Sequence, residues 1–300
     1  MTANGGPAHV PVMTAEVLGH LLPERGGLFV DCTVGLGGHA RAILAAGATR
    51  LIGLDRDEEA LTHARSTLAP WAEKVELVHS DYRDIDNVLE SRHAAEVDGA
   101  LADLGVSSMQ FDEPGRGFSF QRDEPLDMRM DRSVGDTAAA LIARADEREI
   151  ADRIYAFGEE RFSRRIARAI VEARRDGPID TTAKLATLVR RAIPVRGYQR
   201  IDPATRTFQA LRIWVNRELE GLDTFIGKIA RRLRVGARLV IITFHSLEDR
   251  IVKHTFRALE KSADAAIKVL TKKPLVPGNA EIAANPRARS AKLRAAERLA

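Results

Sequence analysis

The stretch Val30-Asp31-Cys32-Thr33-Val34-Gly35-Leu36-Gly37-Gly38-His39-Ala40 places a glycine-rich turn between an apolar run and a helical pattern. Because glycine lacks a Cβ atom, the backbone of such a turn can approach a ligand closely. The next apolar run ends at Asp55, where a carboxylate can accept hydrogen bonds from both hydroxyls of a ribose. Turn and carboxylate together predict a site for a nucleoside-type cofactor without identifying it.

Short apolar runs alternate with amphipathic stretches on both sides of this turn. Helical patterns begin near Gly38, Asp57 and Asp84, and the predicted strands cover residues 28–33, 50–55, 74–80 and 97–104. Strands that alternate with helices in this way form a parallel sheet with right-handed crossovers. The predicted fold class is therefore α/β, with a doubly wound, Rossmann-like sheet.

This alternation stops after residue 106. Residues 107–207 show no convincing strand, only a loop with Gly, Pro and Phe and amphipathic helical segments such as 147–175 and 182–192. The α/β pattern then resumes with a helix over 208–232, a strand over 237–244, a helix over 246–260 and a short strand over 266–270.

The order of these elements predicts one α/β domain that is interrupted by a second domain. Residues 1–106 and 208–300 form the two parts of the α/β domain, and residues 107–207 form an all-helical insertion. The low hydrophobicity of residues 286–300 predicts that this last segment is disordered in the free protein.

Acidic residues stand in register at the ends of four successive predicted strands, at Asp31, Asp55, Asp81 and Asp103. We expect them to face the carboxyl edge of the sheet, where doubly wound sheets bind ligands. Asp81 would accept a hydrogen bond from an adenine amino group, and Tyr82 would cover the adenine ring. An acidic edge suits the cation of S-adenosylmethionine better than the pyrophosphate of a dinucleotide. The spacing Gly35-x-Gly37-x-x-Ala40 nevertheless fits the dinucleotide fingerprint, so a nicotinamide-dependent oxidoreductase is the alternative at this point.

Composition excludes several classes of protein. The lone Cys32 cannot form an internal disulfide, and no Cys and His cluster has zinc-site spacing, so we expect neither a disulfide framework nor a metal. The first residues lack the pattern of a signal peptide, and no run of about 18 apolar residues could span a bilayer. We therefore expect a cytoplasmic protein without a membrane segment.

Charge is unevenly distributed along the chain. From Lys268 onward eight basic residues face two acidic ones, a net charge of +6, whereas the whole chain carries +4. A basic tail on a slightly acidic body is typical of proteins that bind a polyphosphate, and a merely soluble C-terminal segment is the alternative.

Seven motifs resemble those of a known family. They are His9-Val10-Pro11-Val12-Met13, Val34-Gly35-Leu36-Gly37-Gly38-His39, Asp103-Leu104-Gly105-Val106-Ser107-Ser108-Met109-Gln110, Gly115-Arg116-Gly117-Phe118-Ser119-Phe120, Leu126-Asp127-Met128-Arg129-Met130, Arg206-Thr207-Phe208-Gln209-Ala210-Leu211-Arg212 and Phe244-His245-Ser246-Leu247-Glu248-Asp249-Arg250. Over nearly its whole length the chain resembles the bacterial RsmH family, also called MraW, of small-subunit ribosomal RNA (cytosine-N4)-methyltransferases.

The resemblance implies a class I methyltransferase sheet with a helical insertion, S-adenosyl-L-methionine as cofactor, and a cytosine in the decoding region of 16S ribosomal RNA as target. The implied partner is the ribosomal RNA or the small ribosomal subunit. The residues implied to contact the cofactor are Gly37, Gly38, His39, Asp55, Tyr82, Asp103 and Gln110. Family members often have Phe at the position of Tyr82, which keeps the aromatic face and adds a hydroxyl.

The predicted catalytic residues are Asp103 and His245, each at the end of a predicted strand. The chain lacks the Asp/Asn-Pro-Pro-Tyr motif of many amino-group methyltransferases of DNA and keeps only the acid, Asp103. Either side chain could receive or orient a proton of the target amine. For His245 the alternative is a structural residue that precedes a helix with Ser246 as its N-cap.

Two further segments could bring the target base to the site. Residues 111–120 contain Phe111, Phe118 and Phe120, which predict a flap that stacks on a base or, alternatively, ordinary packing. A basic segment with Arg190, Arg191, Arg196, Arg200 and Arg206, opposed by Asp202, is either an RNA-facing surface or a solvated helix face. A non-catalytic RNA-binding factor is a further alternative, and the oligomeric state stays open, with a homodimer as one option.

Overall fold

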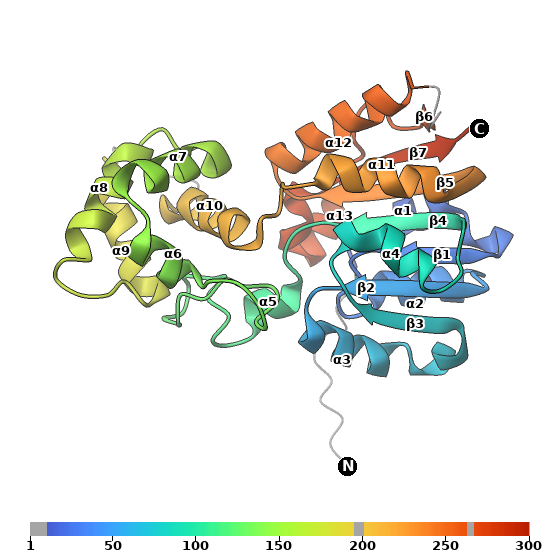
Figure 1. Cartoon of the computed structure of the whole chain (residues 1–300), viewed down its shortest axis with the longest axis horizontal. Helices are drawn as coiled ribbons and strands as arrows, with labels where there is room; N and C mark the ends of the chain where they lie inside the picture. Colours follow the sequence, from blue (N-terminus) through green and yellow to red (C-terminus); the bar gives the residue numbers. More distant parts are fainter. Residues whose placement is uncertain (1–10, 195–200, 263–266, 300) are drawn as a thin grey trace, which may run out of the picture. The chain divides into compact units, whose positions relative to one another are not determined.

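The computed structural model describes residues 11–194, 201–262 and 267–299, and it divides into two compact units (Figure 1). Unit 1 comprises Met1–Gly105 and Glu220–Ala300, and unit 2 comprises Val106–Leu219. The predicted boundary at residue 207 thus differs from the observed one, because the helix that follows it packs into the core of unit 2. His9, Val10, Arg196, Arg200 and Ala266, which carried predictions above, lie outside the described residues.

Unit 1 is built on a seven-stranded sheet with the order β3-β2-β1-β4-β5-β7-β6. Its strands are β1 (Leu28–Asp31), β2 (Arg50–Asp55), β3 (Val75–His79), β4 (Val97–Asp103), β5 (Leu233–Thr243), β6 (Ile267–Val269) and β7 (Lys292–Arg298). The first five strands in this order are parallel to one another, whereas β7 pairs antiparallel with both β5 and β6. The predicted doubly wound α/β sheet is thus confirmed, with strand order reversing between β1 and β4.

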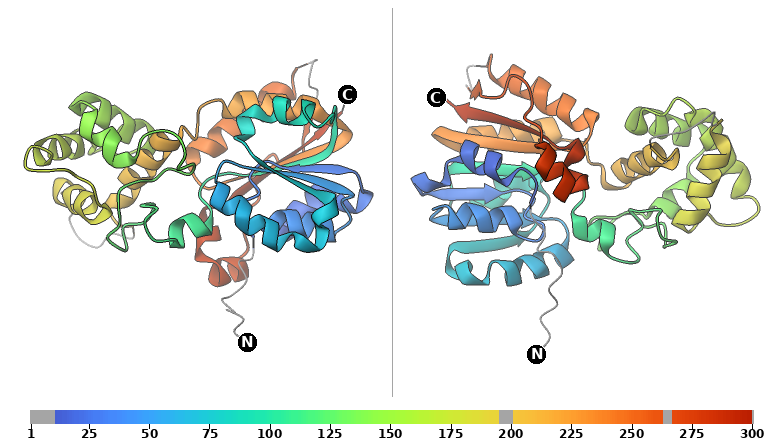
Figure 2. Two further views of the ribbon diagram at one scale, coloured as in Figure 1. Left: turned by 60° about the horizontal axis from the view of Figure 1, so that its bottom comes forward. Right: turned by 180° about the vertical axis from the view of Figure 1, so that it is seen from behind.

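Helices cover both faces of this sheet (Figure 2). On one face lie α1 (Thr14–Leu21), α2 (Gly38–Ala45) and α3 (Glu58–Thr67), and on the other lie α4 (Ile85–Glu90), α11 (Leu222–Arg232) and α12 (Ser246–Leu259). The short elements of this unit are α13 (Asn279–Ala284) and the 3-10 turns η1 (Pro23–Arg25), η2 (Ala69–Lys74), η3 (Tyr82–Asp84) and η4 (Pro286–Ser290). Each face has its own apolar core.

The prediction that residues 286–300 are disordered was wrong. Residues 292–298 form β7, between β5 and β6. The strand was not predicted from hydrophobicity because it contains the charged residue Arg294. In the structure the guanidinium of Arg294 is buried, and Asp249 neutralises its charge, with Nε and Oδ1 2.6 Å apart. The other buried residues of this strand are Leu293, Ala295 and Ala296.

Unit 2 is helical. It contains α5 (Ser108–Asp112), α6 (Ala138–Arg144), α7 (Glu147–Gly158), α8 (Ser163–Ala173), α9 (Thr182–Ala192) and α10 (Ala204–Asn216), which share one apolar core. The predicted helical segment over 147–175 is broken after α7, where Glu159 adopts a left-handed conformation with φ 49°. Helices end at such residues because the left-handed backbone cannot continue the hydrogen-bonding pattern.

The predicted helix over 208–232 is likewise two helices, α10 and α11. Arg217 ends α10 with φ 51°, and Gly221 precedes α11 with φ 69°. The division between the two units falls inside this short connection. Among the described residues, none of the helices is both long and apolar enough for a membrane span.

Candidate functional site

The glycine-rich turn after β1 needs its glycines. Gly37 has φ 82°, and a Cβ on it would lie 3.1 Å from Cγ of Leu68. A Cβ on Gly38 would lie only 2.8 Å from Cγ of Pro11. The N–H of Gly37 donates to the carbonyl oxygen of Val34 at 2.8 Å, which closes the turn directly before α2. Both positions therefore require glycine, because a side chain would collide with Leu68 or Pro11.

Asp55, at the end of β2, is joined to this turn. Its Oδ2 accepts a hydrogen bond from the N–H of Gly35 at 2.8 Å, and its Oδ1 accepts one from the N–H of Asp57 at 2.9 Å. Burial raises the pKa of Asp55 to about 6, although these two hydrogen bonds oppose the rise. Each carboxylate oxygen retains a second lone pair, so Asp55 can still accept hydrogen bonds from ligand hydroxyls.

Asp31 lies deeper in the sheet than predicted. In the parallel register Asp31 is opposite Gly53 and Leu101, so it stands two positions before Asp55 and Asp103 along the strand direction. The prediction of four acids level with one another is therefore wrong for Asp31. Because side chains alternate across a sheet, Asp31, Asp55 and Asp103 nevertheless point to the same face.

The carboxyl group of Asp31 is almost completely buried, with 1% of the residue exposed. Its Oδ1 accepts from the N–H of Thr33 at 3.2 Å, whereas its Oδ2 has no hydrogen-bond partner. Burial raises the pKa of Asp31 to about 7, and the neighbouring carboxylates of Asp103 and Asp55 add to this rise.

His39, in the first turn of α2, lies beside Asp103. Its Nε2 is 3.5 Å from Oδ2 of Asp103, and neither ring nitrogen is aligned for a hydrogen bond with the protein. Burial by itself would lower the pKa of His39, but the carboxylates of Asp103, Asp31 and Glu281 outweigh burial and raise it. Oδ1 of Asp103 is also buried without a partner.

Asp31 and His39, which are buried, and Asp103, whose side chain is 23% exposed, thus form a cluster in which Asp31 Oδ2, both ring nitrogens of His39 and Asp103 Oδ1 have no hydrogen-bond partner. Buried polar atoms in folded proteins nearly always have partners, and a group of exceptions in one place is explained by a bound ligand or water molecule. Two of the three groups are acids, and the cluster adjoins the glycine-rich turn. The arrangement suits a ligand that carries positive charge and N–H donors at one end.

The end of β3 differs from the expectation for Asp81. Arg83 binds both carboxylate oxygens of Asp81, with Nε to Oδ1 at 2.8 Å and Nη2 to Oδ2 at 2.6 Å. Burial would raise the pKa of Asp81, but Arg83 outweighs it and lowers the pKa. Tyr82 packs against Phe225, with ring centroids 4.6 Å apart. Asp81 is therefore engaged by Arg83, and Tyr82 keeps a partly exposed ring.

His245 is the N-cap of α12, which corrects the assignment of that position to Ser246. Its Nδ1 accepts a hydrogen bond from the N–H of Glu248 at 3.4 Å, and its Nε2 lies 3.1 Å from Oε1 of Glu248. Oε2 of Glu248 accepts in turn from the N–H of Phe244 at 3.0 Å. Nδ1 of His245 therefore caps α12, and its buried Nε2 faces Glu248 without an aligned hydrogen bond.

Gln110 belongs to unit 2, so the structure does not place it with the cluster in unit 1. It forms a capping box with Ser107: its N–H donates to Ser107 Oγ at 3.3 Å, and its Oε1 accepts from the N–H of Ser107 at 3.0 Å. This box fixes the start of α5 directly after the strand that carries Asp103.

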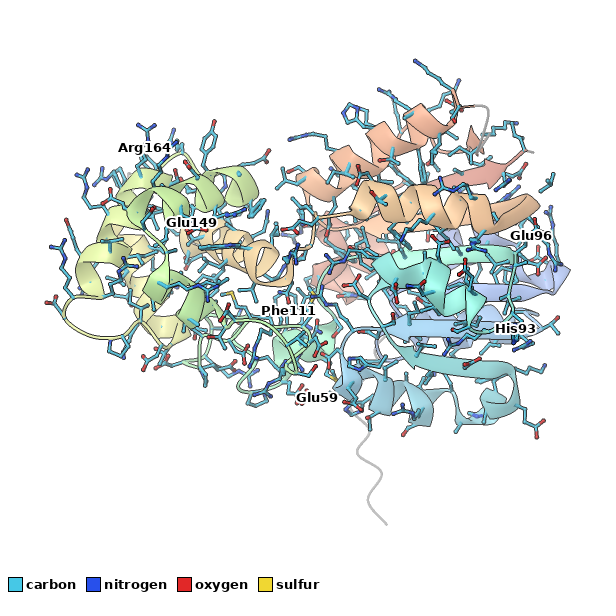
Figure 3. All side chains as sticks on the ribbon, in the orientation of Figure 1. Glu59, His93, Glu96, Phe111, Glu149 and Arg164 are labelled. Carbon is cyan, nitrogen blue, oxygen red and sulfur yellow. The ribbon has the colours of Figure 1, made fainter. Side chains whose placement is uncertain are left out.

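The predicted aromatic flap is packed into unit 2. Phe111, labelled in Figure 3, contacts Phe118 with ring centroids 6.3 Å apart, and Phe120 contacts Phe208 at 4.7 Å. All four rings belong to or pack against the core of the unit, which favours the packing alternative.

The predicted basic segment is partly engaged as well. Arg190 binds Asp202, with Nη2 and Oδ2 2.8 Å apart, and its guanidinium lies over the ring of Phe120. Arg206 donates to the carbonyl oxygen of Glu159 at 3.1 Å. Arg191 is exposed.

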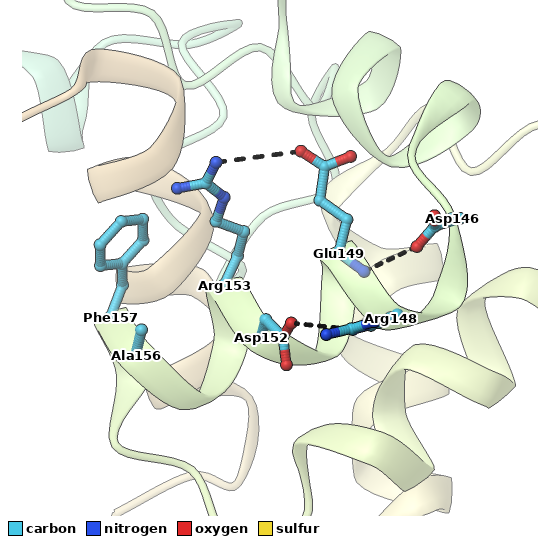
Figure 4. Close-up of a pocket in the computed structure, with 7 residues that line it drawn as sticks. All are labelled: Asp146, Arg148, Glu149, Asp152, Arg153, Ala156 and Phe157. Atoms are coloured by element: carbon cyan, nitrogen blue, oxygen red, sulfur yellow. Dashed lines mark hydrogen bonds and ion pairs between the residues drawn. The ribbon is translucent and has the colours of Figure 1, made fainter.

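A shallow hollow of about 420 Å³ lies along α7 in unit 2 (Figure 4). It is lined by one face of the helix, where Arg148 pairs with Asp152 at 3.8 Å and Arg153 pairs with Glu149 at 3.9 Å. Pairs of exposed charges one turn apart are typical of a solvated helix face. The hollow contains none of the predicted site residues.

Known proteins resemble this chain over almost its full length. The sequence profile of the MraW methylase family matches residues 7–299. A "Ribosomal RNA small subunit methyltransferase H" from Cyanothece sp. is 52% identical, with 97% of this chain and 95% of that protein covered. Proteins of the same name from Sorangium cellulosum and Nitrobacter winogradskyi are 50% and 49% identical, with 98% and 97% of this chain and 92% and 90% of those proteins covered.

Proposed function

Because this chain belongs to the MraW methylase family, we propose that it transfers the methyl group of S-adenosylmethionine to the N4 amino group of a cytosine in the decoding region of small-subunit ribosomal RNA. The enzyme class and the cofactor are those of the family. The observation that carries the proposal at this site is the cluster of Asp31, His39 and Asp103 beside the glycine-rich turn, with its buried polar atoms that lack partners. A cytoplasmic setting follows from a ribosomal substrate.

The site residues fit S-adenosylmethionine better than a dinucleotide. The cofactor carries an ammonium group and a sulfonium cation, which Asp31 and Asp103 would stabilise by charge and by accepting N–H hydrogen bonds. We propose that Asp55 accepts from the ribose hydroxyls, that Gly37 and Gly38 let the backbone approach, and that His39 contacts the methionine end. A pyrophosphate would instead lie beside buried acids, which argues against the nicotinamide alternative.

Two further contacts are proposed on the basis of family resemblance. Tyr82 would cover the adenine ring with its partly exposed face, and Gln110 would complete the cofactor site from the start of α5. The hydroxyl of Tyr82 matters little for this role, because stacking uses the ring face.

Chemistry at N4 needs a group that localises the amine lone pair. S-adenosylmethionine supplies an electrophilic methyl group, so the carbon–sulfur bond breaks as the carbon–nitrogen bond forms. We propose that Asp103 accepts hydrogen bonds from the amino hydrogens, bends the amine out of conjugation and then takes the released proton. His245 was also predicted to accept this proton, but its ring nitrogens face Glu248. We therefore propose Asp103 as the proton acceptor.

A methyl-transfer assay tests the proposed function. Small ribosomal subunits from a bacterium that lacks this activity are incubated with the protein and labelled S-adenosylmethionine, and the RNA is digested to nucleosides for mass analysis. We expect N4-methylcytidine as the labelled product. Binding of S-adenosylmethionine without any product would support the non-catalytic factor instead, and binding of NAD alone would support the oxidoreductase.

A further inference from the structure

A group of basic side chains gathers at the carboxyl edge of the sheet in unit 1. It consists of Lys272 and Lys273, in the segment after β6, and of Arg287, Arg289 and Lys292, in and just after η4. We name these five residues the carboxyl-edge basic surface. Lys272, Lys273, Arg287 and Arg289 are exposed, and the side chain of Lys292 is 36% exposed.

Strand register places this surface on the same edge as Asp103. Asp103 pairs with Ile242 in β5, and the next residue of β5, Thr243, pairs with Lys292 at the start of β7. Because η4 directly precedes β7, Arg287 and Arg289 lie at this edge as well. Figure 2 shows the segment that contains α13 at the arrowheads of the parallel strands.

The two lysines reach the same edge from the neighbouring strand. β6 runs antiparallel to β7, and after it the N–H of Leu270 donates to the carbonyl oxygen of Ala295 at 2.9 Å. Leu275 then pairs with Leu293, one residue from Lys292. Lys272 and Lys273 stand between these two points, so they border the same edge.

Four other charged residues between β6 and the end of β7 already have partners within the protein. Glu281 accepts from the N–H of Met13 at 2.6 Å, and Glu297 pairs with Arg238 at 2.8 Å. Arg294 pairs with Asp249. The guanidinium of Arg298 donates to the carbonyl oxygens of Ala230 and Arg231.

By contrast, Lys272, Lys273 and Arg289 form no ion pair within the described part of the chain. Their charge is therefore available to a partner, and it stands at the edge on which the proposed cofactor and the target base would meet.

We propose that the carboxyl-edge basic surface binds the phosphate backbone of the RNA that carries the target nucleotide. The inference rests on the proposed function for its choice of RNA. Asp31, Asp55 and Asp103 give the site itself an acidic character, which repels phosphates, so cations along the rim would offset that repulsion and guide the strand. Each phosphate that is neutralised also releases a counterion, which favours binding at low salt.

A triple variant tests the surface directly. Lys272→Ala, Lys273→Ala and Arg289→Ala are combined, and binding of a 16S RNA fragment that spans the decoding region is measured by fluorescence anisotropy between 50 and 300 mM salt. If each side chain contacts one phosphate, the slope of log K against log salt becomes shallower by about 2, and affinity at 100 mM salt falls by roughly a hundredfold when affinity at 1 M salt is unchanged. Affinity for S-adenosylmethionine stays unchanged, which shows that the variant is folded.

The matched control removes three exposed cations at the opposite edge of the same sheet. Arg25, Arg50 and Lys74 lie at or just before the starts of β1, β2 and β3, and they form no ion pair among the described residues. Their replacement by Ala also removes three positive charges but should leave the slope within about 0.5 of that of the parent protein, since these side chains make no phosphate contact.

Each outcome decides the inference. An unchanged slope in the first variant, or an equal change in the control, overturns it. Weaker binding to whole subunits with unchanged binding to free RNA would indicate a contact with ribosomal protein and would overturn it too. If the parent protein makes no N4-methylcytidine but the slope still falls in the first variant alone, the surface stands and only the proposed function fails.

Discussion

Asp31 is a carboxyl group whose surroundings disfavour its charge. It is buried, one of its oxygens has no partner, and two other acids lie nearby, so its pKa is raised to about 7. A pKa that is raised in the folded state means that folding takes up a proton between the unfolded and folded values. The free energy of unfolding therefore falls as pH rises from about 4 to beyond 7.

The variant Asp31→Asn should remove this pH dependence. Asn keeps an oxygen for the N–H of Thr33 but carries no charge, so the two proteins should be similar in stability near pH 4. Above pH 7 the variant should be more stable, by at most about 4 kcal/mol for a shift of about three pKa units. Urea unfolding at pH 5, 6.5 and 8 measures the difference; a difference that does not grow with pH would refute the account.

Asp103 and His245 are distinguished by conservative substitutions. Asp103→Asn keeps the size of the side chain but cannot take a proton, so kcat should fall by about 100-fold. His245→Asn replaces one capping residue by another, so kcat and stability should stay close to those of the parent protein. Single-turnover methyl transfer at saturating S-adenosylmethionine gives the comparison. A large loss of kcat in His245→Asn with α12 intact would return the catalytic role to His245.

At the scale of elements, β7 contributes to the stability of the sheet more than its charged sequence indicates. It pairs with β5 over six residues and with β6 over three, and it carries the buried ion pair of Arg294 with Asp249. Removing residues 286–300 would therefore expose both neighbouring strands. We expect loss of soluble protein, not the selective loss of RNA binding that a disordered tail would give.

The ion pair of β7 provides a sharper test with a matched control. Asp249→Ala leaves the buried guanidinium of Arg294 without its counterion, which should lower the free energy of unfolding by about 3 kcal/mol. Lys292→Ala removes a partner of the same carboxylate, but this lysine is 3.7 Å away and 36% exposed, so the loss should stay below about 1 kcal/mol. Urea unfolding of both variants is the measurement, and equal losses would contradict this assignment.

The sequence predicted those elements whose signal is local. The strands that end at Asp55 and Asp103 are apolar runs, and the turn at Gly37 has glycines that its backbone requires. The breaks at Glu159 and Arg217 were missed, because both residues are ordinary helix formers that adopt a left-handed backbone only in this tertiary setting. β7 was not predicted because Arg294, although buried in the structure, is a charged residue that is typical of an exposed segment.

The candidate site was predicted in part, for a similar reason. Motif spacing pointed to the residues around the glycine-rich turn and to Asp103, but it gave no sign that His39 stands 3.5 Å from Asp103. Asp31 was recognised as an acid at a strand end and was not counted among the contacts, because its depth depends on register with two other strands. Register is a property of the assembled sheet.

At the scale of the whole molecule, unit 2 has what an independent domain needs. Its core draws on all helices from α6 to α10. Polar contacts inside the unit join distant segments: Asn216 accepts from the N–H of Met130 at 2.8 Å and donates to the carbonyl oxygen of Met128 at 2.7 Å. Arg174 donates to the carbonyl oxygens of Ile142 and Ala145 at 2.8 and 2.6 Å.

A fragment of residues 106–219 should accordingly fold by itself. We expect a helical circular dichroism spectrum and a single cooperative thermal transition, because the core and the polar contacts named above lie wholly within the fragment. The fragment should not bind S-adenosylmethionine measurably. A spectrum without a cooperative transition would show that this unit depends on the rest of the chain.

The position of unit 2 in the chain also bears on how the protein reaches its native state. β4 and β5 are neighbours in the sheet, yet the whole helical unit separates them in the sequence. Pairing them requires closure of a very long loop, whereas the helices of unit 2 pack through contacts between near neighbours. Refolding should therefore regain most of its helical signal early and its ligand-binding competence late. In that interval the unpaired side of β4 is where self-association would begin.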